Sequence, residues 1–382
     1  AVSSASSVLS RSPWVPVRTI KAIHQFSVSC SPGDGISNSM RFIQRLIRGR
    51  GLTSEIYVMD RPEAMQDVAR LYETLDPRAT DLLLIHHGGG NPATRWLKQL
   101  PCAKVLVYHN ITPERFFPPY DPLRQTLKYG REQLVDWKRA IDGAIAVSGR
   151  NYAELMEAGY SAEKTAIIPL LVDLERFKPA RDTVDAGHND PARLLFVGRL
   201  APHKNQHGLV AMLAELVHMT NRSVHLTLVG EGDQSMATGL RDLATHLGVS
   251  DRVEITGKVS DECLSALYSQ ADLYVSMSEH EGFGMPLVEA MIHEVPIVAY
   301  AAPESSLVET VAGGGLVLDT PDLAVVAATA ATLLENAPLR AQLIKAQRQR
   351  LDELRSDCLD QRFADFLQTL GFVLNPDTTG PA

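Results

Sequence analysis

Two cations in the second half of the chain have the types and spacing needed to hold an anionic ligand. Arg199 and Lys204 follow the apolar run 193–197, which predicts a strand, so both lie near its carboxyl end. Two cations there suit a diphosphate, which carries charge and needs several donors. Solvated loop cations are the common alternative. Ligands bind at the carboxyl ends of strands in open α/β sheets, which favours the phosphate site.

The segment 278–291, SEHEGFGMPLVEAM, carries the strongest signal in the chain. Gly282 and Gly284 leave backbone amides open to a ligand just before a predicted helix. The carboxylates of Glu281 and Glu289 can accept hydrogen bonds from sugar or ribose hydroxyls. Compensation of the helix dipole would explain Glu289 without any ligand. It does not explain Glu281 or the two glycines.

A glycine pair in the first half follows a predicted strand that ends at Phe26. Gly33 and Gly35 precede a helix with apolar residues on one face. Glycines between a strand and a helix let backbone N–H groups approach an anion, although a turn that needs positive φ explains them equally well. The spacing is not GxGxxG, which disfavours an NAD-dependent dehydrogenase.

A second glycine-rich segment, residues 87–90, follows another predicted strand. Its sequence HGGG could form an esterase oxyanion hole, but the chain has no GxSxG elbow, and AVSG at 146–149 is the nearest approximation. We therefore interpret it as a further loop facing the cleft, near an acceptor. The adjacent His86 and His87 point in different directions, and no DxD-like motif accompanies them. We expect no catalytic metal.

Short apolar runs alternate with amphipathic helices, which predicts an α/β chain with two doubly wound parallel sheets. A Pro-rich polar stretch separates the two sets of strands and predicts a linker. We expect a disordered tail at 1–18, domains at 19–170 and 192–355, a linker at 171–191, and a helix at 356–371 that packs back on the first domain. The predicted strands are residues 20–26, 54–59, 82–86, 104–108, 143–147, 165–168, 193–197, 224–229, 253–256, 272–276, 295–299 and 316–318.

Together these motifs resemble family 4 glycosyltransferases. The resemblance rests on Glu281 and Glu289 within EGFGMPLVEAM, on Arg199 and Lys204 around VGRL, and on the early glycine loop. It covers about residues 20–334 and implies the GT-B fold, in which two Rossmann-like domains face each other across a cleft. The motifs are specific for the family and much less so for the sugar.

The resemblance implies roles for residues of the second domain. Arg199 and Lys204 would hold the donor diphosphate and neutralise the leaving group, and Glu289 would bind the ribose hydroxyls. Glu281 would hold the transferred sugar together with three backbone amides, those of Phe283, Gly284 and Met285. Three successive residues after a predicted strand would contact the base: Gly257, Lys258 and Val259.

The resemblance also implies roles in the first domain. Gly33 and Gly35 would let their loop close on the phosphates. His109, in YHNITP, matches the histidine at the cleft edge that would touch the sugar beside the reacting carbon. The alternative is that His109 is an ordinary loop histidine whose hydrogen bonds are made within the protein.

The implied activity is retaining transfer of a hexose from a GDP- or UDP-sugar to a glycan or lipid-linked acceptor, without metal or cofactor. No carboxylate is placed as a nucleophile, so we expect attack on the same face, with the departing phosphate taking the proton of the acceptor. A catalytically silent GT-B partner subunit and a GT-B sugar-nucleotide epimerase remain as alternatives.

Composition limits the partners and the location. The net charge of -8 disfavours broad nucleic-acid binding. Four scattered cysteines, and no secretory signal in the Ser-rich start, favour the reducing cytoplasm. Basic stretches at 41–50 and 123–139 would allow peripheral contact with the cytoplasmic face of a membrane, or form an ordinary solvated surface.

Overall fold

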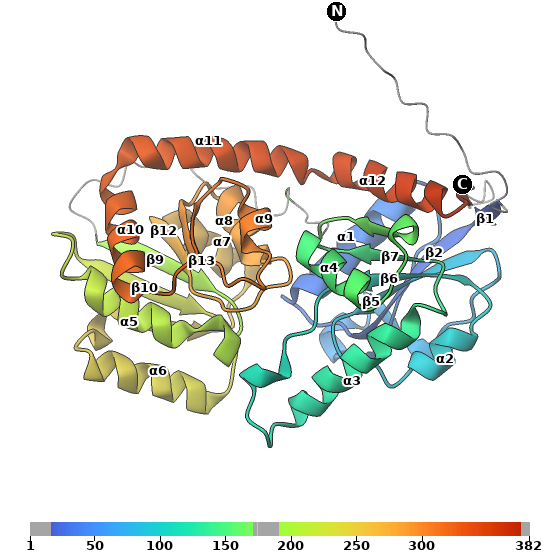
Figure 1. Cartoon of the computed structure of the whole chain (residues 1–382), viewed down its shortest axis with the longest axis horizontal. Helices are drawn as coiled ribbons and strands as arrows, with labels where there is room; N and C mark the ends of the chain where they lie inside the picture. Colours follow the sequence, from blue (N-terminus) through green and yellow to red (C-terminus); the bar gives the residue numbers. More distant parts are fainter. Residues whose placement is uncertain (1–16, 171–173, 175–190, 376–382) are drawn as a thin grey trace, which may run out of the picture.

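The computed structural model describes residues 17–170, 174 and 191–375 of the chain. Two α/β domains, each built on a parallel sheet, lie beside each other, as Figure 1 shows. Each half of the sequence forms one of them. This arrangement confirms the predicted fold class. The predicted tail as far as residue 16 lies outside the described residues, and so does the predicted linker apart from residues 174 and 191.

The first domain is built on a seven-stranded parallel sheet in the order β4-β3-β2-β5-β6-β7-β8. Its central strand β5 is apolar because helices cover both faces, and residues 82–85 are at most 1% exposed. The strands are β2 (Ala22–Ser29), β3 (Ile56–Asp60), β4 (Ala69–Leu71), β5 (Asp81–His87), β6 (Ala103–Tyr108), β7 (Gly143–Ala146) and β8 (Thr165–Ile167). The helices are α1 (Gly35–Gly49), α2 (Thr94–Gln99), α3 (Pro122–Trp137) and α4 (Gly149–Glu157), with single 3₁₀ turns η1 (Glu63–Met65), η2 (Tyr72–Thr74), η3 (Glu114–Phe116) and η4 (Ala162–Lys164).

The second domain has a six-stranded parallel sheet in the order β11-β10-β9-β12-β13-β14. Helix α5 buries Leu209, Leu213 and Leu216 against it, a spacing of four and three residues. The strands are β9 (Ala192–Val197), β10 (Val224–Val229), β11 (Val253–Gly257), β12 (Leu273–Ser276), β13 (Ile297–Tyr300) and β14 (Leu316–Leu318). The helices are α5 (Gln206–Leu216), α6 (Gln234–His246), α7 (Asp261–Gln270), α8 (Met285–Ile292), α9 (Leu307–Val311) and α10 (Leu323–Glu335), with 3₁₀ turns η6 (Pro202–Lys204) and η7 (Ser250–Arg252).

The end of the chain crosses back from the second domain to the first. Helices α11 (Ala337–Glu353) and α12 (Ser356–Thr369) run along both domains in Figure 1. Leu359 packs against Phe42 of α1, and Arg50 forms an ion pair of 2.7 Å with Asp360. Helix α12 therefore covers the first domain.

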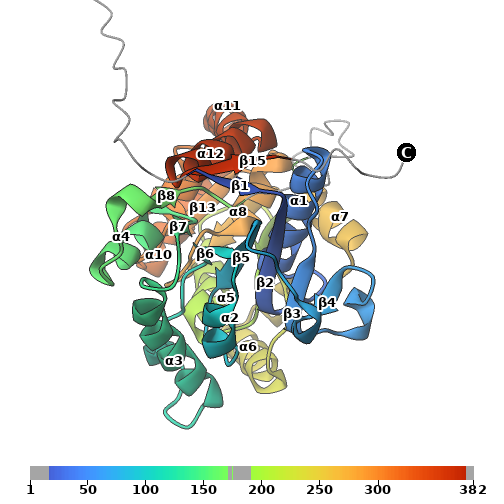
Figure 2. The same ribbon diagram turned by 90° about the vertical axis from the view of Figure 1, so that its right-hand side faces the viewer.

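A short sheet not predicted from the sequence joins the two chain ends. Strand β15 (Phe372–Leu374) pairs in parallel with β1 (Arg18–Ile20), and Figure 2 shows them side by side beneath α12. The expected strand 20–26 is thus divided into β1 and β2. Arg18, placed in the predicted tail, belongs to this sheet.

Candidate active site

The loop after β2 touches the second domain at two of the predicted donor-binding residues. A Cβ added at Gly33 would lie 3.8 Å from Cε of Lys258, which follows β11. A Cβ added at Gly35 would lie 3.4 Å from Cγ of Met285, which begins α8. The carboxyl ends of the two sheets therefore face each other here. At Gly33 the φ of +79°, rather than lack of space, requires glycine.

Lys204 and Glu281 form an ion pair that links the two strongest sequence motifs. Lys204 Nζ lies 2.5 Å from Glu281 Oε1, and the two side chains are 16% and 15% exposed. Turn η6 ends at Lys204, and Glu281 lies in the loop between β12 and α8. The backbone carbonyl of Glu281 accepts hydrogen bonds from the amide and the hydroxyl of Ser306, at 3.2 and 3.1 Å. A cation and a carboxylate that can accept hydrogen bonds from hydroxyl groups are thus held next to each other.

Arg199 lies two residues beyond the end of β9 and is exposed. Its backbone carbonyl accepts a hydrogen bond of 2.8 Å from Gln206, but within the described residues its side chain forms no hydrogen bond or ion pair. The structure therefore brings Lys204 into contact with Glu281 and leaves the Arg199 guanidinium pointing to solvent. An exposed guanidinium retains its five donors for an anionic ligand.

The EGFG loop meets the first domain through its first glycine. A Cβ added at Gly282 would lie 2.6 Å from the backbone oxygen of His109. Gly284 caps the start of α8 with a φ of +86°. The side chain of Phe283 is buried in an apolar cluster, and its carbonyl accepts a hydrogen bond from the hydroxyl of Thr310. The backbone amide is thus the group of Phe283 that can donate a hydrogen bond to a ligand.

Glu289 is held by a tyrosine that sequence reasoning did not find. It is the fifth residue of α8 and 8% exposed, and its Oε2 accepts a hydrogen bond of 2.9 Å from the hydroxyl of Tyr268. Burial, and then the charge of Glu289, raise the pKa of Tyr268 well above its ordinary value, so the hydroxyl remains a donor. Dipole compensation falls off after the first helical turn, so it does not account for this carboxylate.

The predicted base-contact segment follows directly from β11. Gly257 ends the strand with a φ of +69°, and its carbonyl accepts a hydrogen bond of 3.0 Å from the amide of Gly230. Lys258 then reaches the loop at Gly33, and Val259 packs partly against the core that contains Tyr268. The segment therefore lies between the first-domain loop and the tyrosine that holds Glu289.

His109 follows β6 at the edge where the domains meet, and it is 9% exposed. Its Nε2 lies 2.7 Å from Nδ1 of His86, with the two rings only 19° apart in orientation. Burial lowers the pKa of His86 to about 3 and that of His109 well below its ordinary value. Both imidazoles are therefore neutral at pH 7. Nothing in the local sequence around either histidine indicates that they are neighbours.

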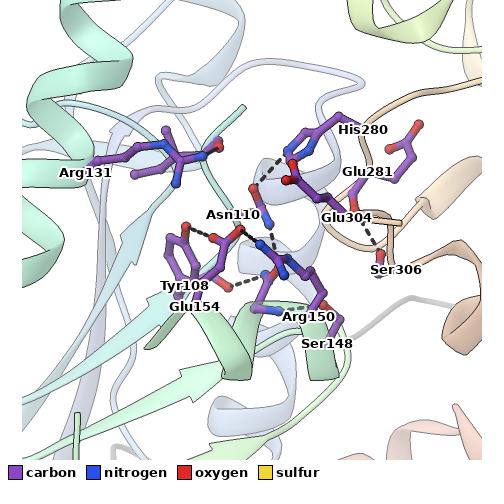
Figure 3. A network of polar contacts seen from close by, with 12 residues as sticks. Tyr108, Asn110, Arg131, Ser148, Arg150, Glu154, His280, Glu281, Glu304 and Ser306 are labelled. Atoms are coloured by element: carbon purple, nitrogen blue, oxygen red, sulfur yellow. Dashed lines mark hydrogen bonds and ion pairs between the residues drawn. The ribbon is translucent and has the colours of Figure 1, made fainter. Parts of the chain in front are cut away.

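A polar network joins the domains beside Glu281, as Figure 3 shows. His280 Nε2 donates to Asn110 Oδ1 at 2.9 Å, and Asn110 Nδ2 donates to Asn151 Oδ1 at 2.9 Å. Asn151 in turn donates to the carbonyl of Tyr108 at 3.0 Å. Asn110 has a φ of +76°, which is unusual for a residue other than glycine. The network fixes the loop that carries His109 against the loop that carries Glu281.

Two further contacts tie the domains together at the rim of this network. Arg115 forms an ion pair of 2.8 Å with Glu304, and it lowers the pKa of that carboxyl. The amide of Gly149, at the start of α4, donates to Glu309 Oε2 at 2.6 Å. The two domains thus meet through polar and charged contacts as well as through the glycine loops.

The last glycine of the HGGG segment, residues 87–90, packs against α3. The amide of Gly90 donates to the carbonyl of Thr126 at 3.0 Å, and a Cβ at Gly90 would lie 2.7 Å from that oxygen. His87 Nε2 donates to the carbonyl of Gly130 at 2.9 Å, so the loop packs against α3. Ser148, in the AVSG segment at 146–149, is the N-cap residue of α4. In the described part of the chain, no three His, Cys, Asp or Glu side chains gather closely enough to hold a metal ion.

In the two basic stretches, residues 41–50 and 123–139, several cationic side chains already have partners within the protein. Arg48 and Arg50 form ion pairs of 3.3 and 2.7 Å, and Arg124 and Arg131 donate to backbone carbonyls. Lys128 on α3 is exposed. None of the helices described here combines the length and the apolar character needed to cross a bilayer.

The two facing parallel domains, with the site residues at their carboxyl edges, define a GT-B protein. The family model described as "Glycosyl transferases group 1" matches residues 181–350, and the one described as "Glycosyltransferase Family 4" matches residues 21–176. The chain therefore belongs to the family 4, group 1 glycosyltransferases, as the motifs predicted.

Named relatives share the chain's sequence over part of their length. The D-inositol 3-phosphate glycosyltransferase 2 of Catenulispora acidiphila is 32% identical over 191 residues, which is 47% of this chain and 44% of that protein. The GDP-mannose:cellobiosyl-diphosphopolyprenol alpha-mannosyltransferase of Komagataeibacter xylinus is 30% identical over 192 residues, 47% of this chain and 46% of that protein. The chain thus matches less than half the length of these relatives.

Among solved structures, the fold is similar to that of Anabaena Alr3699/HepE in complex with UDP and glucose. The TM-score is 0.70 at 19% sequence identity, and the match covers 91% of this chain and 100% of that one. At this identity the likeness establishes the shared fold.

Proposed function

We propose that the protein is a retaining glycosyltransferase that moves a hexose from a nucleotide-diphosphate sugar to a glycan or lipid-linked acceptor. The observation that carries this proposal is the 2.5 Å contact of Lys204 with Glu281, which lies in the loop whose Gly282 is packed against His109. A fixed cation, a carboxylate that accepts hydroxyl hydrogens and a histidine from the opposite domain are the groups that a charged leaving group and a sugar require.

The proposed roles follow the position of each group. Lys204, with Arg199, neutralises the diphosphate as the bond to the sugar breaks. Glu281 and the loop amides hold the sugar, and Glu289, oriented by Tyr268, binds the ribose hydroxyls. Gly33 and Gly35 bring the loop after β2 over the phosphates, while residues 257–259 contact the base.

The nucleotide is proposed to be uridine or guanosine diphosphate. Two names support this choice: the HepE structure contains UDP and glucose, and the Komagataeibacter relative is named for GDP-mannose. The positive charge that the leaving group requires is supplied by Lys204 and Arg199, so we propose a reaction that needs no divalent cation. The departing phosphate takes the acceptor's proton on the face from which it leaves.

The acceptor is proposed to be a glycan or a lipid-linked sugar. The protein is proposed to act in the cytoplasm. The four cysteines are unpaired, which agrees with a reducing compartment. Contact with the cytoplasmic face of a membrane would use the outer side of α3, where Lys128 and the half-exposed Tyr129 face solvent. The ion-paired Arg48 and Arg50 contribute little to such a surface.

Binding of nucleoside diphosphates tests the proposal before the sugar is known. UDP and GDP are added separately, each with and without EDTA, and the melting temperature is followed. At a hundredfold excess over its dissociation constant, the correct nucleotide should stabilise the protein by about 2.7 kcal/mol. Stabilisation that disappears with EDTA would contradict the metal-independent mechanism. No stabilisation by either nucleotide would contradict the donor site itself.

A further inference from the structure

Three buried polar side chains form a line behind the cleft edge of the first domain. Gln25 of β2 is fully buried, and its Nε2 donates to the carbonyl of Met40 at 2.9 Å. Its Oε1 lies 3.1 Å from Nε2 of His86, at the end of β5. Nδ1 of His86 lies 2.7 Å from Nε2 of His109. The line thus runs from α1 through the sheet to the residue that faces the second domain.

The direction of every hydrogen bond in this line is set at its inner end. The carbonyl of Met40 can only accept, so Gln25 must turn its NH₂ group to it and its oxygen to His86. That oxygen can only accept, so the hydrogen of neutral His86 is on Nε2 and its Nδ1 is an acceptor. The hydrogen of neutral His109 is then on Nε2, and its Nδ1 carries a lone pair.

Burial keeps this pattern intact at neutral pH. It lowers the pKa of His86 to about 3 and that of His109 well below the ordinary value, so neither ring takes up a second proton. Besides His86, the ionisable group that would act on His109 if it were protonated is His87. Its pKa is lowered to about 4. One tautomer of His109 therefore dominates over the range in which an enzyme of this kind would work.

The outer end of the line is an acceptor without a partner. Nδ1 of His109 is buried and forms no hydrogen bond with any described residue. Buried polar atoms nearly always have a partner, so such an atom calls for an explanation. The backbone of His109 lies against Gly282, next to Glu281, where the proposed function places the sugar.

We propose that Gln25 and His86 are positioning residues that lock His109 in the Nε2–H tautomer, so that its Nδ1 accepts a hydrogen bond from a hydroxyl of the donor sugar. This inference rests on the proposed function. A site that presents only a lone pair at this point selects sugars with a hydroxyl there and disfavours those without one. Gln25 and His86 thereby contribute to donor specificity without touching the donor.

The tautomer is measured directly by NMR on protein labelled with ¹⁵N in histidine, without any ligand. In the wild type, Nε2 of His109 should have the shift of a protonated nitrogen and Nδ1 that of an unprotonated one. Gln25→Leu removes the acceptor of His86, so both rings should shift toward the Nδ1–H form. Gln25→Glu can still donate to Met40 as a carboxylic acid and accept from His86, so it should restore the wild-type pattern.

Gln44→Leu is the matched control for loss of a buried glutamine. Gln44 is 7% exposed and donates to the carbonyl of Ser54 at 3.0 Å, away from the histidines. It should leave the tautomer of His109 unchanged. A wild-type His109 protonated at Nδ1, or a Gln25→Leu spectrum identical to that of Gln44→Leu, would overturn the positioning role.

Calorimetry with UDP-glucose, GDP-mannose, UDP and GDP then tests the link to the sugar. Gln25→Leu should weaken binding of the sugar nucleotide that the wild type prefers by about tenfold, the effect of one hydrogen bond, while binding of the matching diphosphate stays unchanged. An equal loss for both would overturn the contact with the sugar hydroxyl. If the wild type bound none of the four, the proposed function would fail and this contact with it, whereas the tautomer result would still decide the positioning role.

Discussion

Replacing Lys204 by Met removes the positive charge at the centre of the proposed site and keeps most of the side chain's volume. The two side chains of the Lys204–Glu281 pair are 16% and 15% exposed, so the substitution leaves a mostly buried carboxylate without its cation. Loss of a hydrogen bond to a charged group should lower the free energy of unfolding by about 1.5–3 kcal/mol. Loss of a fixed donor to the leaving group should lower kcat by about 10²–10³-fold.

A second buried lysine separates these two effects. Lys104 is 6% exposed and donates to the carbonyls of Leu100 and Cys102 at 2.6 and 3.0 Å, at the opposite end of β6 from the cleft. Lys104→Met should cost a comparable free energy of unfolding and leave kcat unchanged. Steady-state kinetics and urea unfolding on both variants give the comparison.

The outcome that refutes the reasoning is a change in KM alone. If Lys204→Met raised the KM for the donor and left kcat at the wild-type value, Lys204 would bind substrate and transition state equally. The charge would then have no special role as the bond to the diphosphate breaks, and the assignment of Lys204 to the leaving group would be wrong.

Three further predictions address other parts of the structure. Tyr268→Phe removes the 2.9 Å hydrogen bond to Glu289, so calorimetry should show about tenfold weaker binding of the nucleoside diphosphate; unchanged affinity would remove Tyr268 from the site. Gly282→Ala places a Cβ 2.6 Å from the carbonyl of His109, so turnover should fall as the domains separate at a cost of about 1–3 kcal/mol; full activity would contradict the close contact. Burial lowers the pKa of His87 from 6.5 to about 4, so the unfolded state takes up a proton before the folded state, and stability is lost as pH falls from 6.5 to 4. Urea unfolding of His87→Gln over this range should show a pH dependence smaller by up to about 1.4 kcal/mol per pH unit, and an identical slope would contradict it.

The sheets were predictable because strands buried on both faces are nearly continuous in apolar residues. The apolar run predicts a strand over residues 82–86, and β5 runs over Asp81–His87. The EGFG loop was equally clear, since two glycines before a proline-led helix leave few local alternatives. For such elements the conformation is set by neighbours in sequence, so the sequence alone carries the information.

Contacts between distant segments could not be predicted in this way. Strands β1 and β15 are three residues each, and they pair across almost the whole length of the chain. Asn110 and His280 are 170 residues apart, and nothing in their local sequences indicates a hydrogen bond between them. The role of Gly90 is also set by a distant residue, because the oxygen that leaves no room for a side chain belongs to Thr126.

The anomeric configuration of the first product is the most direct test of the proposed mechanism. The proposal places the cations of Lys204 and Arg199 at the leaving group and assigns no carboxylate as a nucleophile, so the acceptor should attack on the face from which the diphosphate departs. The product from an α-linked nucleotide sugar is followed by proton NMR, and the coupling constant of the anomeric proton is read before mutarotation. The proposal predicts an α-linked product. A β-linked product would contradict the retaining mechanism, and with it the roles assigned to Lys204, Glu281 and His109.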